Sequence, residues 1–298
     1  MKGDEILGVV APRSNRFYFV HDPNGSTIMQ LEDYHDYLDK VDEQNKPYRH
    51  LFGGYQLMQN LDLSVAEDRL MKMAQLWDET KIFGRGPEGQ RHVYHVEFGH
   101  YSNLEHFKLF EKYAVSKADS LGMNEVEVQM LLDYWSGRLV DINEEKSTEP
   151  SLQTVLQLTA EMFNQAKKKE LPLSRVHLHP YGSFMMCYAK DKWEDAQDAI
   201  IKGSIAVPKY CQMGNYNSGH SWLDSLDDYE VPDLPREIML PNGKSIPVTP
   251  DSLTYSFDLD DDEESGIHCY LQFFIKCNKV FKTAGMGDTI TATGWIYH

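Results

Sequence analysis

The feature of this sequence that most constrains its fold is a regular alternation of short apolar segments with longer amphipathic ones. β-Branched and aromatic residues predict strands at 16–20, 48–52, 92–97, 120–123, 175–179 and 183–189. Apolar residues at helical spacing predict helices at 29–41, 64–80, 103–114, 124–134, 153–168 and 193–206. Strands that alternate with helices predict an α/β fold, with a mainly parallel sheet covered by helices on both faces.

The C-terminal third is less regular than the rest of the chain. Residues 208–250 are polar and contain several Pro and Gly residues, which predicts an irregular region. Strands at 254–257 and 269–275 are expected to form a β-hairpin, and the acidic run 260–264 between them is typical of a solvated loop. A last helix is predicted at 289–297. Because ligands of such sheets bind beyond the carboxyl ends of the strands, we expect the chemistry there.

Length, charge and hydropathy limit the number of domains and the kinds of partner that this protein can have. The chain has 298 residues, of which 41% are hydrophobic and 25% charged, as in soluble globular proteins. This length suits one large α/β domain or two small ones. A net charge of −17 disfavours nucleic acid as a partner, and no apolar run is long enough to span a bilayer. Residues 1–5 lack the apolar stretch of a signal peptide.

The cysteines give no sign of a metal site. Cys187, Cys211, Cys269 and Cys277 do not have the spacing of metal ligands. Four cysteines are ordinary usage for a chain of this length. From the residues alone we therefore expect free, buried thiols.

The segment 283–289, TAGMGDT, carries the most specific chemistry in the chain. Gly285 and Gly287 lack Cβ atoms and let the backbone approach a ligand closely, and consecutive N–H groups at a helix start form an anion site. Asp288 begins the predicted helix, where its carboxylate can accept a proton from a hydroxyl that attacks phosphorus. The same turn is also an ordinary N-cap, since Asp is a favoured capping residue. The residues alone leave both interpretations open.

Five segments, in the same order along the chain, resemble motifs of the ADP-dependent glucokinase family. Residues 281–290 (FKTAGMGDTI) resemble the segment with the G-L-G-D motif, and residues 11–17 (APRSNRF) resemble A-P-x-A-N-R-F. Residues 95–97 (HVE), 120–127 (SLGMNEVE) and 175–179 (RVHLH) resemble H-x-E, S-L-G-x-N-E-x-E and R-I-H-x-H. The resemblance covers nearly the whole chain and implies a ribokinase-like fold.

The resemblance implies roles for individual residues. In this family the G-x-G-D aspartate is the base that activates the sugar hydroxyl, which implies that role for Asp288. Asp288 is also expected to belong to the metal site. The H-x-E and N-x-x-E glutamates hold Mg²⁺ directly or through water, which implies Glu97 and Glu127 as ligands, with Asn124 in the same network. Mg²⁺ suits these residues because it prefers oxygen ligands. Without the resemblance, the simpler interpretations are favoured: a surface charge at Glu97 and a partner of the helix dipole at Glu127.

The nucleotide site is implied in the same way. Arg16 resembles the arginine of the N-R-F segment, whose planar fork suits phosphate oxygens, although a structural ion pair is an equal alternative. His177, in the R-V-H-L-H strand, is assigned to the adenine, with a satisfied core histidine as the alternative. Gly285 and Asn124 complete the expected nucleotide-binding set.

The resemblance also implies what this chain lacks. Family members have a substantial segment before N-R-F that supplies the first strands of the sheet and most of the lid over the sugar. Residues 1–298 are therefore expected to form one catalytic domain that is truncated at its N-terminus relative to the family and has an incomplete lid. The expected reaction transfers a phosphoryl group from ADP to the 6-hydroxyl of D-glucose, giving glucose 6-phosphate and AMP. The alternatives are an ADP-dependent phosphofructokinase and a non-catalytic nucleotide-binding fragment or pseudokinase.

Partners and location follow from the same resemblance. We expect ADP or AMP and glucose as ligands, Mg²⁺ as cofactor, and a monomer. Animal members enter the secretory pathway, which implies the endoplasmic reticulum, with the cytoplasm as the alternative. Cys211 and Cys277 correspond to cysteines of animal-type members, and a disulfide between them is a hypothesis that rests on this correspondence alone. A sheet without its first strands exposes an edge, so we expect the chain alone to be poorly soluble or partly folded.

Overall fold

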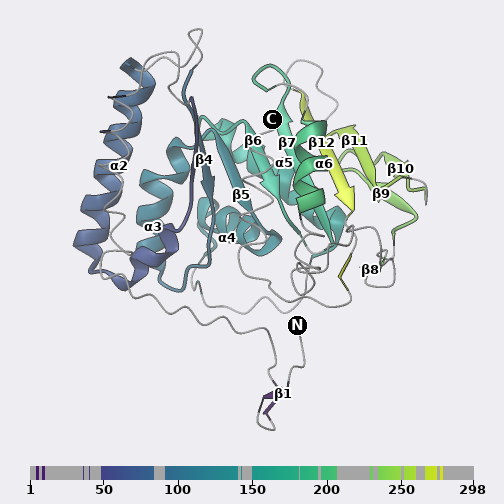
Figure 1. Ribbon diagram of the computed structural model, residues 1–298, viewed down its shortest axis with the longest axis horizontal. Coiled ribbons are helices and arrows are strands. Elements are labelled where there is room, and N and C mark those ends of the chain that lie inside the picture. Colours follow the sequence, from purple (N-terminus) through teal and green to yellow (C-terminus); the bar gives the residue numbers. More distant parts are fainter. Residues whose placement is uncertain are drawn as a thin grey trace, which may run out of the picture.

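Across the described residues, the protein is built on a central sheet of seven strands (Figure 1). Its parallel half consists of β3 (Arg49–Phe52), β4 (Val93–Glu97), β5 (Ser120–Met123) and β6 (Arg175–Leu178). Its antiparallel half adds β7 (Ser183–Ala189), β12 (Ile267–Phe273) and β11 (Thr254–Asp258). The strands lie in the order β11-β12-β7-β6-β5-β4-β3. The computed structural model describes residues 5–6, 9–10, 36, 40, 48–83, 91–139, 142, 150–180, 182–193, 196–206, 229–230, 234–249, 252–259, 266–273 and 276–277.

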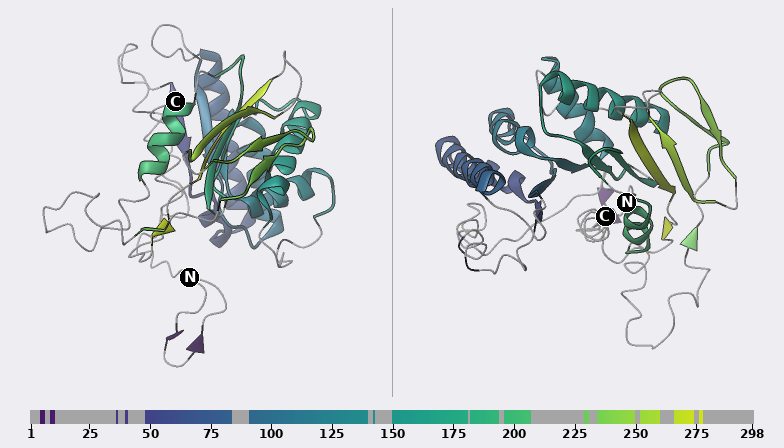
Figure 2. Two further views of the ribbon diagram at one scale, coloured as in Figure 1. Left: turned by 90° about the vertical axis from the view of Figure 1, so that its right-hand side faces the viewer. Right: turned by 90° about the horizontal axis from the view of Figure 1, so that it is seen from above.

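Helices cover both faces of this sheet (Figure 2). One face carries α2 (Leu63–Phe83), α3 (Leu104–Tyr113), α4 (Glu125–Trp135) and α5 (Leu152–Lys168), with the short 3-10 helices η3 (Tyr55–Asn60) and η5 (Val115–Lys117). The other face carries α6 (Gln197–Ala206), which packs on β7 and β12. No helix within the described ranges has the length and apolar character needed to cross a membrane.

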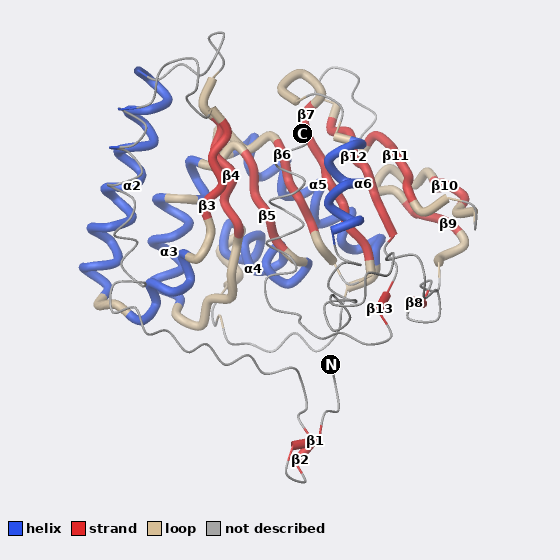
Figure 3. Tube along the Cα trace, in the orientation of Figure 1, coloured by secondary structure: helices blue, strands red, loops and turns tan. Residues whose placement is uncertain are grey.

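Smaller strand pairs lie outside the central sheet (Figure 3). They are β1 (Glu5–Ile6) with β2 (Val9–Val10), β8 (Tyr229–Glu230) with β13 (Lys276–Cys277), and β9 (Glu237–Met239) with β10 (Ser245–Pro247). The β9–β10 hairpin falls within residues 208–250, so the prediction of an irregular region was wrong there. Its turn contains Gly243 in the left-handed region, with φ of 83°, next to Asn242. Asn-Gly between two strands is a strong hairpin signal that composition alone conceals.

The predicted α/β class, with helices on both faces of the sheet, is confirmed. The strands and helices predicted between residues 48 and 206 are present, although α6 begins at Gln197 and not at residue 193. The predicted hairpin of the C-terminal third is also present, as β11 and β12. Predicted elements at 16–20, 29–41 and 289–297 lie wholly or largely outside the described residues.

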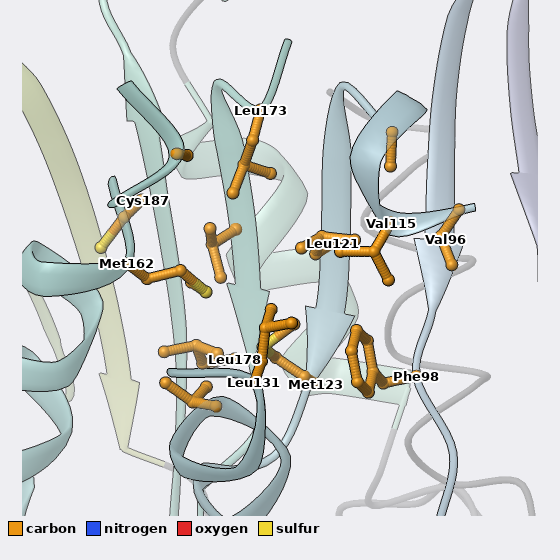
Figure 4. Packing of buried hydrophobic residues seen from close by; sticks show 14 of the residues in the cluster. Val96, Phe98, Val115, Leu121, Met123, Leu131, Met162, Leu173, Leu178 and Cys187 are labelled. Atoms are coloured by element: carbon orange, nitrogen blue, oxygen red, sulfur yellow. The ribbon is translucent and has the colours of Figure 1, made fainter. Parts of the chain in front are cut away.

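The two faces of the parallel strands differ in chemistry. Side chains alternate along a strand, so Val96, Leu121 and Val176 face the helices α2–α5 and belong to the main apolar core; Figure 4 shows the first two of them within it. Their neighbours point to the opposite face, and these are mostly polar: His95, Glu97, Ser120, Gly122, Arg175 and His177. The five of them that have side chains are all buried. The sheet therefore has an apolar face and, over β4 to β6, a buried polar face.

The cysteines depart from the prediction of free thiols. Cys187 in β7 and Cys269 in β12 occupy paired positions and form a disulfide. The expectation was therefore wrong for these two residues, because pairing between β7 and β12 places them opposite each other across 82 residues of chain. Cys211 and the side chain of Cys277 lie outside the described part of the chain, so their proposed disulfide stays a prediction.

A buried carboxylate ties the amino ends of the parallel strands together. Asp119 accepts the N–H of Tyr94 on Oδ2 at 3.0 Å and Arg91 Nη2 on Oδ1 at 2.6 Å. Its backbone carbonyl accepts the N–H of Ser174 at 2.9 Å. The loop before β5 is thereby bonded to β4 and to the residue before β6.

We predict that Asp119→Ala lowers the free energy of unfolding by about 1–3 kcal/mol, because the N–H of Tyr94 loses its partner in the interior. Urea denaturation followed by circular dichroism measures the change. The control is Asp198→Ala, which removes an exposed ion pair with Lys202 at 3.1 Å and should change stability little. Equal losses in the two variants would contradict the role of Asp119.

Candidate functional site

The candidate site lies at the carboxyl edge of the parallel strands. Glu97 is the last residue of β4 and pairs with Gly122 near the end of β5. The N–H of Phe98 donates to the carbonyl of Gly122 at 2.8 Å, which continues the pairing beyond β4. Asn124 follows β5 directly and caps α4. Two segments separated by more than twenty residues therefore meet at one edge of the sheet.

The Glu97 carboxylate is held between two histidines. His179 Nε2 lies 2.9 Å from Oε1, and His95 Nε2 lies 3.3 Å from Oε2. Only 5% of Glu97 is exposed. Burial acts to raise the pKa of this carboxyl, but the hydrogen bonds from His179 and His95 outweigh it and hold the pKa well below its usual range. Glu97 is therefore an ionised carboxylate in the interior, with the shorter contact to His179.

Gly122 makes room for this carboxylate. A Cβ atom at position 122 would overlap the Glu97 carboxylate and come within 2.8 Å of His95 Nε2. No strain of the backbone is involved, because Gly122 lies in a regular strand. A glycine inside a strand often marks a close approach of another group, and here that group is the side chain of the neighbouring strand.

The N-terminus of α4 is closed by a capping box. Asn124 Oδ1 accepts the N–H groups of Val126 and Glu127, both at 2.9 Å. In return, Glu127 Oε2 accepts the N–H of Asn124 at 2.9 Å. This reciprocal pair fixes both side chains at the start of the helix. Glu127 therefore has a structural role at the start of α4, through hydrogen bonds shared with Asn124 and not only through the helix dipole.

Negative charge is concentrated around Glu127. The pKa of its carboxyl is raised to about 7, chiefly by burial, and the charges of Glu97 and Glu125 add to this rise. The hydrogen bond from Asn124 and the charge of His179 act in the opposite direction. The charges of Glu97 and His179 both act on the pKa of Glu127, so the three groups lie within electrostatic reach of one another. The site therefore favours a proton or a cation close to Glu127.

His177 lies in the middle of the polar face. It is fully buried and pairs with Gly122 on one side and Met186 on the other. Within the described part of the chain, neither of its ring nitrogens has a hydrogen-bond partner. Burial holds the pKa of this imidazole well below its usual range, and the charge of Arg175 adds to the effect. His177 is therefore a neutral ring with two unused polar atoms, and its assignment to adenine stays a prediction.

The structure brings together some of the predicted residues. Glu97, Asn124 and Glu127 lie at one edge of the sheet, and His177 lies on the adjoining strand. The other predicted residues lie outside the described ranges: Arg16, Gly285, Gly287 and Asp288.

Three residues of the site were not predicted to act in it. His95 and His179 stand inside the H-x-E and R-x-H-x-H segments, so the sequence contained a signal for both. Gly122 stands inside S-L-G, where a glycine in a strand was the signal.

Oxygen is the main donor that this site offers to a metal ion. The described residues contain no group of three His, Cys, Asp or Glu side chains arranged to hold a metal. Glu97 and Glu127 supply carboxylate oxygens, while Nε2 of each flanking histidine is engaged by Glu97. A hard ion that keeps most of its water would suit such a set better than a metal that needs a full protein cage.

Comparison with known proteins places the chain in a family. Residues 1–297 match the ADP-specific Phosphofructokinase/Glucokinase conserved region. The chain belongs to this family. An ADP-dependent glucokinase from Bos taurus is 22% identical over 303 residues, an alignment that covers 99% of this chain and 56% of the relative. The chain thus spans about half the length of the curated relative that it matches.

Solved structures of similar proteins share the fold. The "Last common ancestor of ADP-dependent phosphofructokinases from Methanosarcinales" has a TM-score of 0.56 at 19% identity, with 89% of this chain and 53% of that chain covered. An "ADP-dependent kinase complex with fructose-6-phosphate and ADPbetaS" has a TM-score of 0.54 at 17% identity, with 89% and 56% covered. The expected ribokinase-like α/β fold of the ADP-dependent kinases is confirmed.

The contact between Gly122 and Glu97 gives a direct test. We predict that Gly122→Ala destabilises the protein by about 1–3 kcal/mol, because the new methyl group must displace the buried carboxylate from its histidines. Gly53→Ala is the control, since a Cβ there would meet only Glu97 Cβ, at 3.4 Å. Thermal and urea denaturation measure both variants. A Gly122→Ala protein as stable as the control would show that the carboxylate can lie elsewhere at no cost.

Proposed function

We propose that this member of the family transfers a phosphoryl group from ADP to the 6-hydroxyl of D-glucose, giving glucose 6-phosphate and AMP. Membership of a kinase family whose description joins glucokinase and phosphofructokinase supports the reaction class. The glucokinase relative and the motif resemblance support glucose as the acceptor. The observation that carries the proposal is the meeting of Glu97 and Glu127 at the carboxyl edge of the parallel strands, where α/β proteins bind their ligands.

In this proposal Glu97 and Glu127 hold Mg²⁺, directly or through water. Two carboxylates fit an ion that binds proteins through one or two carboxylates plus substrate phosphates and keeps several waters. Burial of Glu127 next to Glu97 and Glu125 leaves negative charge that a divalent cation would relieve. When bound, the ion would supply neutralisation of the charge on the phosphates.

The side chains of the protein would do the remaining work. Asp288 would accept the proton of the sugar hydroxyl, while the N–H groups at Gly285 and Gly287 would face the oxygens of the transferred group. His179 would keep Glu97 ionised and oriented through its 2.9 Å contact. Arg16 and His177 would bind the phosphates and the adenine of the nucleotide.

A second acceptor has support from the comparisons. The family description includes phosphofructokinase, and a structural neighbour is described as a complex with fructose-6-phosphate. Both reactions use the same donor and the same base, so they differ in the sugar alone. Fructose 6-phosphate is therefore the alternative substrate in the assay.

The direct test is a kinase assay with ADP and Mg²⁺, offering glucose or fructose 6-phosphate in separate reactions. We expect formation of glucose 6-phosphate and AMP, measured by coupled reduction of a nicotinamide cofactor and by chromatography of the nucleotides. Asp288→Ala should lower kcat by at least about a hundredfold, because it removes the general base. Binding of ADP without any sugar phosphate from either acceptor would favour a non-catalytic nucleotide-binding protein.

The cation role of Glu127 can be separated from its capping role. Glu127→Gln retains an oxygen that can accept the N–H of Asn124, so the helix start and the stability should persist. It removes a charge, so affinity for Mn²⁺, used as a paramagnetic probe, should fall by about tenfold or more. Glu105→Gln, in the exposed first turn of α3, is the control with the same loss of charge. Unchanged Mn²⁺ affinity in Glu127→Gln would leave Glu127 with its capping role only.

A further inference from the structure

A chain of hydrogen bonds crosses three strands on the polar face of the sheet and ends on Glu97. Arg175 Nη1 in β6 donates to Ser120 Oγ in β5 at 2.9 Å. Ser120 Oγ lies 2.7 Å from His95 Nδ1 in β4. His95 Nε2 lies 3.3 Å from Glu97 Oε2. Arg175, Ser120 and His95 are fully buried, so water does not compete for these contacts.

The chemistry of the groups fixes the direction of this chain. A carboxylate only accepts, so the hydrogen between His95 and Glu97 must sit on His95 Nε2. Arg175 only donates, so Ser120 Oγ is an acceptor towards Arg175 and has its own hydrogen left to give. A neutral imidazole carries hydrogen on one nitrogen only, and in His95 that nitrogen is Nε2, which faces Glu97. His95 Nδ1 therefore stays bare and accepts the hydroxyl hydrogen of Ser120.

We infer that Arg175 and Ser120 are positioning residues, which hold His95 in its Nε2–H form and so orient the Glu97 carboxylate. The inference deepens the proposed function and rests on it, because it concerns the carboxylate that would hold the cation. Neither Arg175 nor Ser120 touches a ligand in this scheme. Both act through His95.

Arg175 is well suited to anchor the chain. Its guanidinium carbon lies 5.4 Å from the centre of the Trp193 ring, and Nη2 lies 3.3 Å from Met186 Sδ. Trp193 is fixed in turn, because its Nε1 donates to Ser174 Oγ at 3.0 Å. Burial lowers the pKa of Arg175 to about 9, with the charge of Arg49 adding to the effect, so the guanidinium stays charged at neutral pH. The donor that starts the chain therefore has a fixed place and a fixed charge.

The hydrogen-bond chain from Arg175 ends on Oε2 of Glu97, while His179 contacts Oε1. The contact of His179 with Oε1 at 2.9 Å does not depend on Ser120. Two donors on two oxygens fix the plane of the carboxylate, and each oxygen keeps a further acceptor site for a cation or its water. Loss of the Ser120 hydroxyl would free His95 to turn or to exchange its hydrogen between nitrogens, leaving Glu97 held at one end.

The first measurement concerns the tautomer of His95 and uses the unmodified protein. Histidine labelled with ¹⁵N gives separate signals for a bare and a protonated nitrogen, and His95→Gln assigns the signals of His95 by their loss. We expect a neutral ring with hydrogen on Nε2 and none on Nδ1. Hydrogen on Nδ1 in the unmodified protein would overturn the inference without any variant being made.

The second measurement links the chain to the site. In Ser120→Ala we expect the Nδ1 signal of His95 to shift, and Mn²⁺ affinity measured by electron paramagnetic resonance to fall by about 10- to 100-fold, the usual effect of losing an outer-shell partner. Ser183→Ala is the control, since Ser183 is also a buried serine of the central sheet but is not one of the residues in the hydrogen-bond chain from Arg175 to Glu97. Ser120→Thr retains the hydroxyl and should restore the affinity.

The outcomes separate this inference from the proposed function. If the unmodified protein binds Mn²⁺ and Ser120→Ala binds it equally well, the positioning role is wrong while the kinase proposal stands. If the unmodified protein binds no Mn²⁺ at all, the cation role of Glu97 fails and the inference fails with it, whatever the tautomer of His95. A Ser120→Ala protein with weaker Mn²⁺ binding but unshifted His95 signals would also overturn the route through His95.

Discussion

The burial of the Glu97 carboxylate is the constraint on which the rest of the polar face depends. An ionised carboxylate in the interior costs several kcal/mol unless its oxygens find donors. His179 and His95 provide one donor each, and the missing Cβ of Gly122 provides the space. Because Nε2 of His95 donates to Glu97, its other ring nitrogen, Nδ1, also needs a hydrogen-bond partner in the interior, which Ser120 provides. One buried charge thus accounts for a row of polar residues that would otherwise be out of place in a sheet.

Some residues that meet at the candidate site could be named from the sequence, but their contacts could not. Parallel strands that are covered on both faces normally consist of continuous apolar runs. Here the segments H-V-E, S-L-G and R-V-H place a polar residue or a glycine at every second position, and this alternation marks one face of each strand. Glu97 and His177 were predicted from the motif resemblance, and this alternation agrees with their place on one face. The sequence could not indicate that His179 and His95 share Glu97, or that Arg175 reaches Ser120, because those contacts depend on the register between strands.

The fold was predictable where local patterns are long, and it was missed where composition concealed a turn or where pairing is distant. Helices α3, α4 and α5 have strong caps at Asn103, Asn124 and Ser151, and each was predicted to within a residue or two. The hairpin β9–β10 was missed because the Pro and Gly content of its region outweighed the Asn-Gly turn. The disulfide between Cys187 and Cys269 was missed because it requires β12 to lie beside β7. No local sequence pattern predicts that pairing.

The two interpretations of Glu127 that the sequence set against each other are compatible in the structure. Oε2 of Glu127 accepts the N–H of Asn124, so the helix start fixes the orientation of the whole carboxyl group. A group that is fixed before a ligand arrives loses little freedom when the ligand binds, and this strengthens binding. The capping box therefore does not argue against a cation at Glu127. It supplies the rigidity that a carboxylate beside Glu97 and Glu125 would need in order to bind a cation without first being ordered.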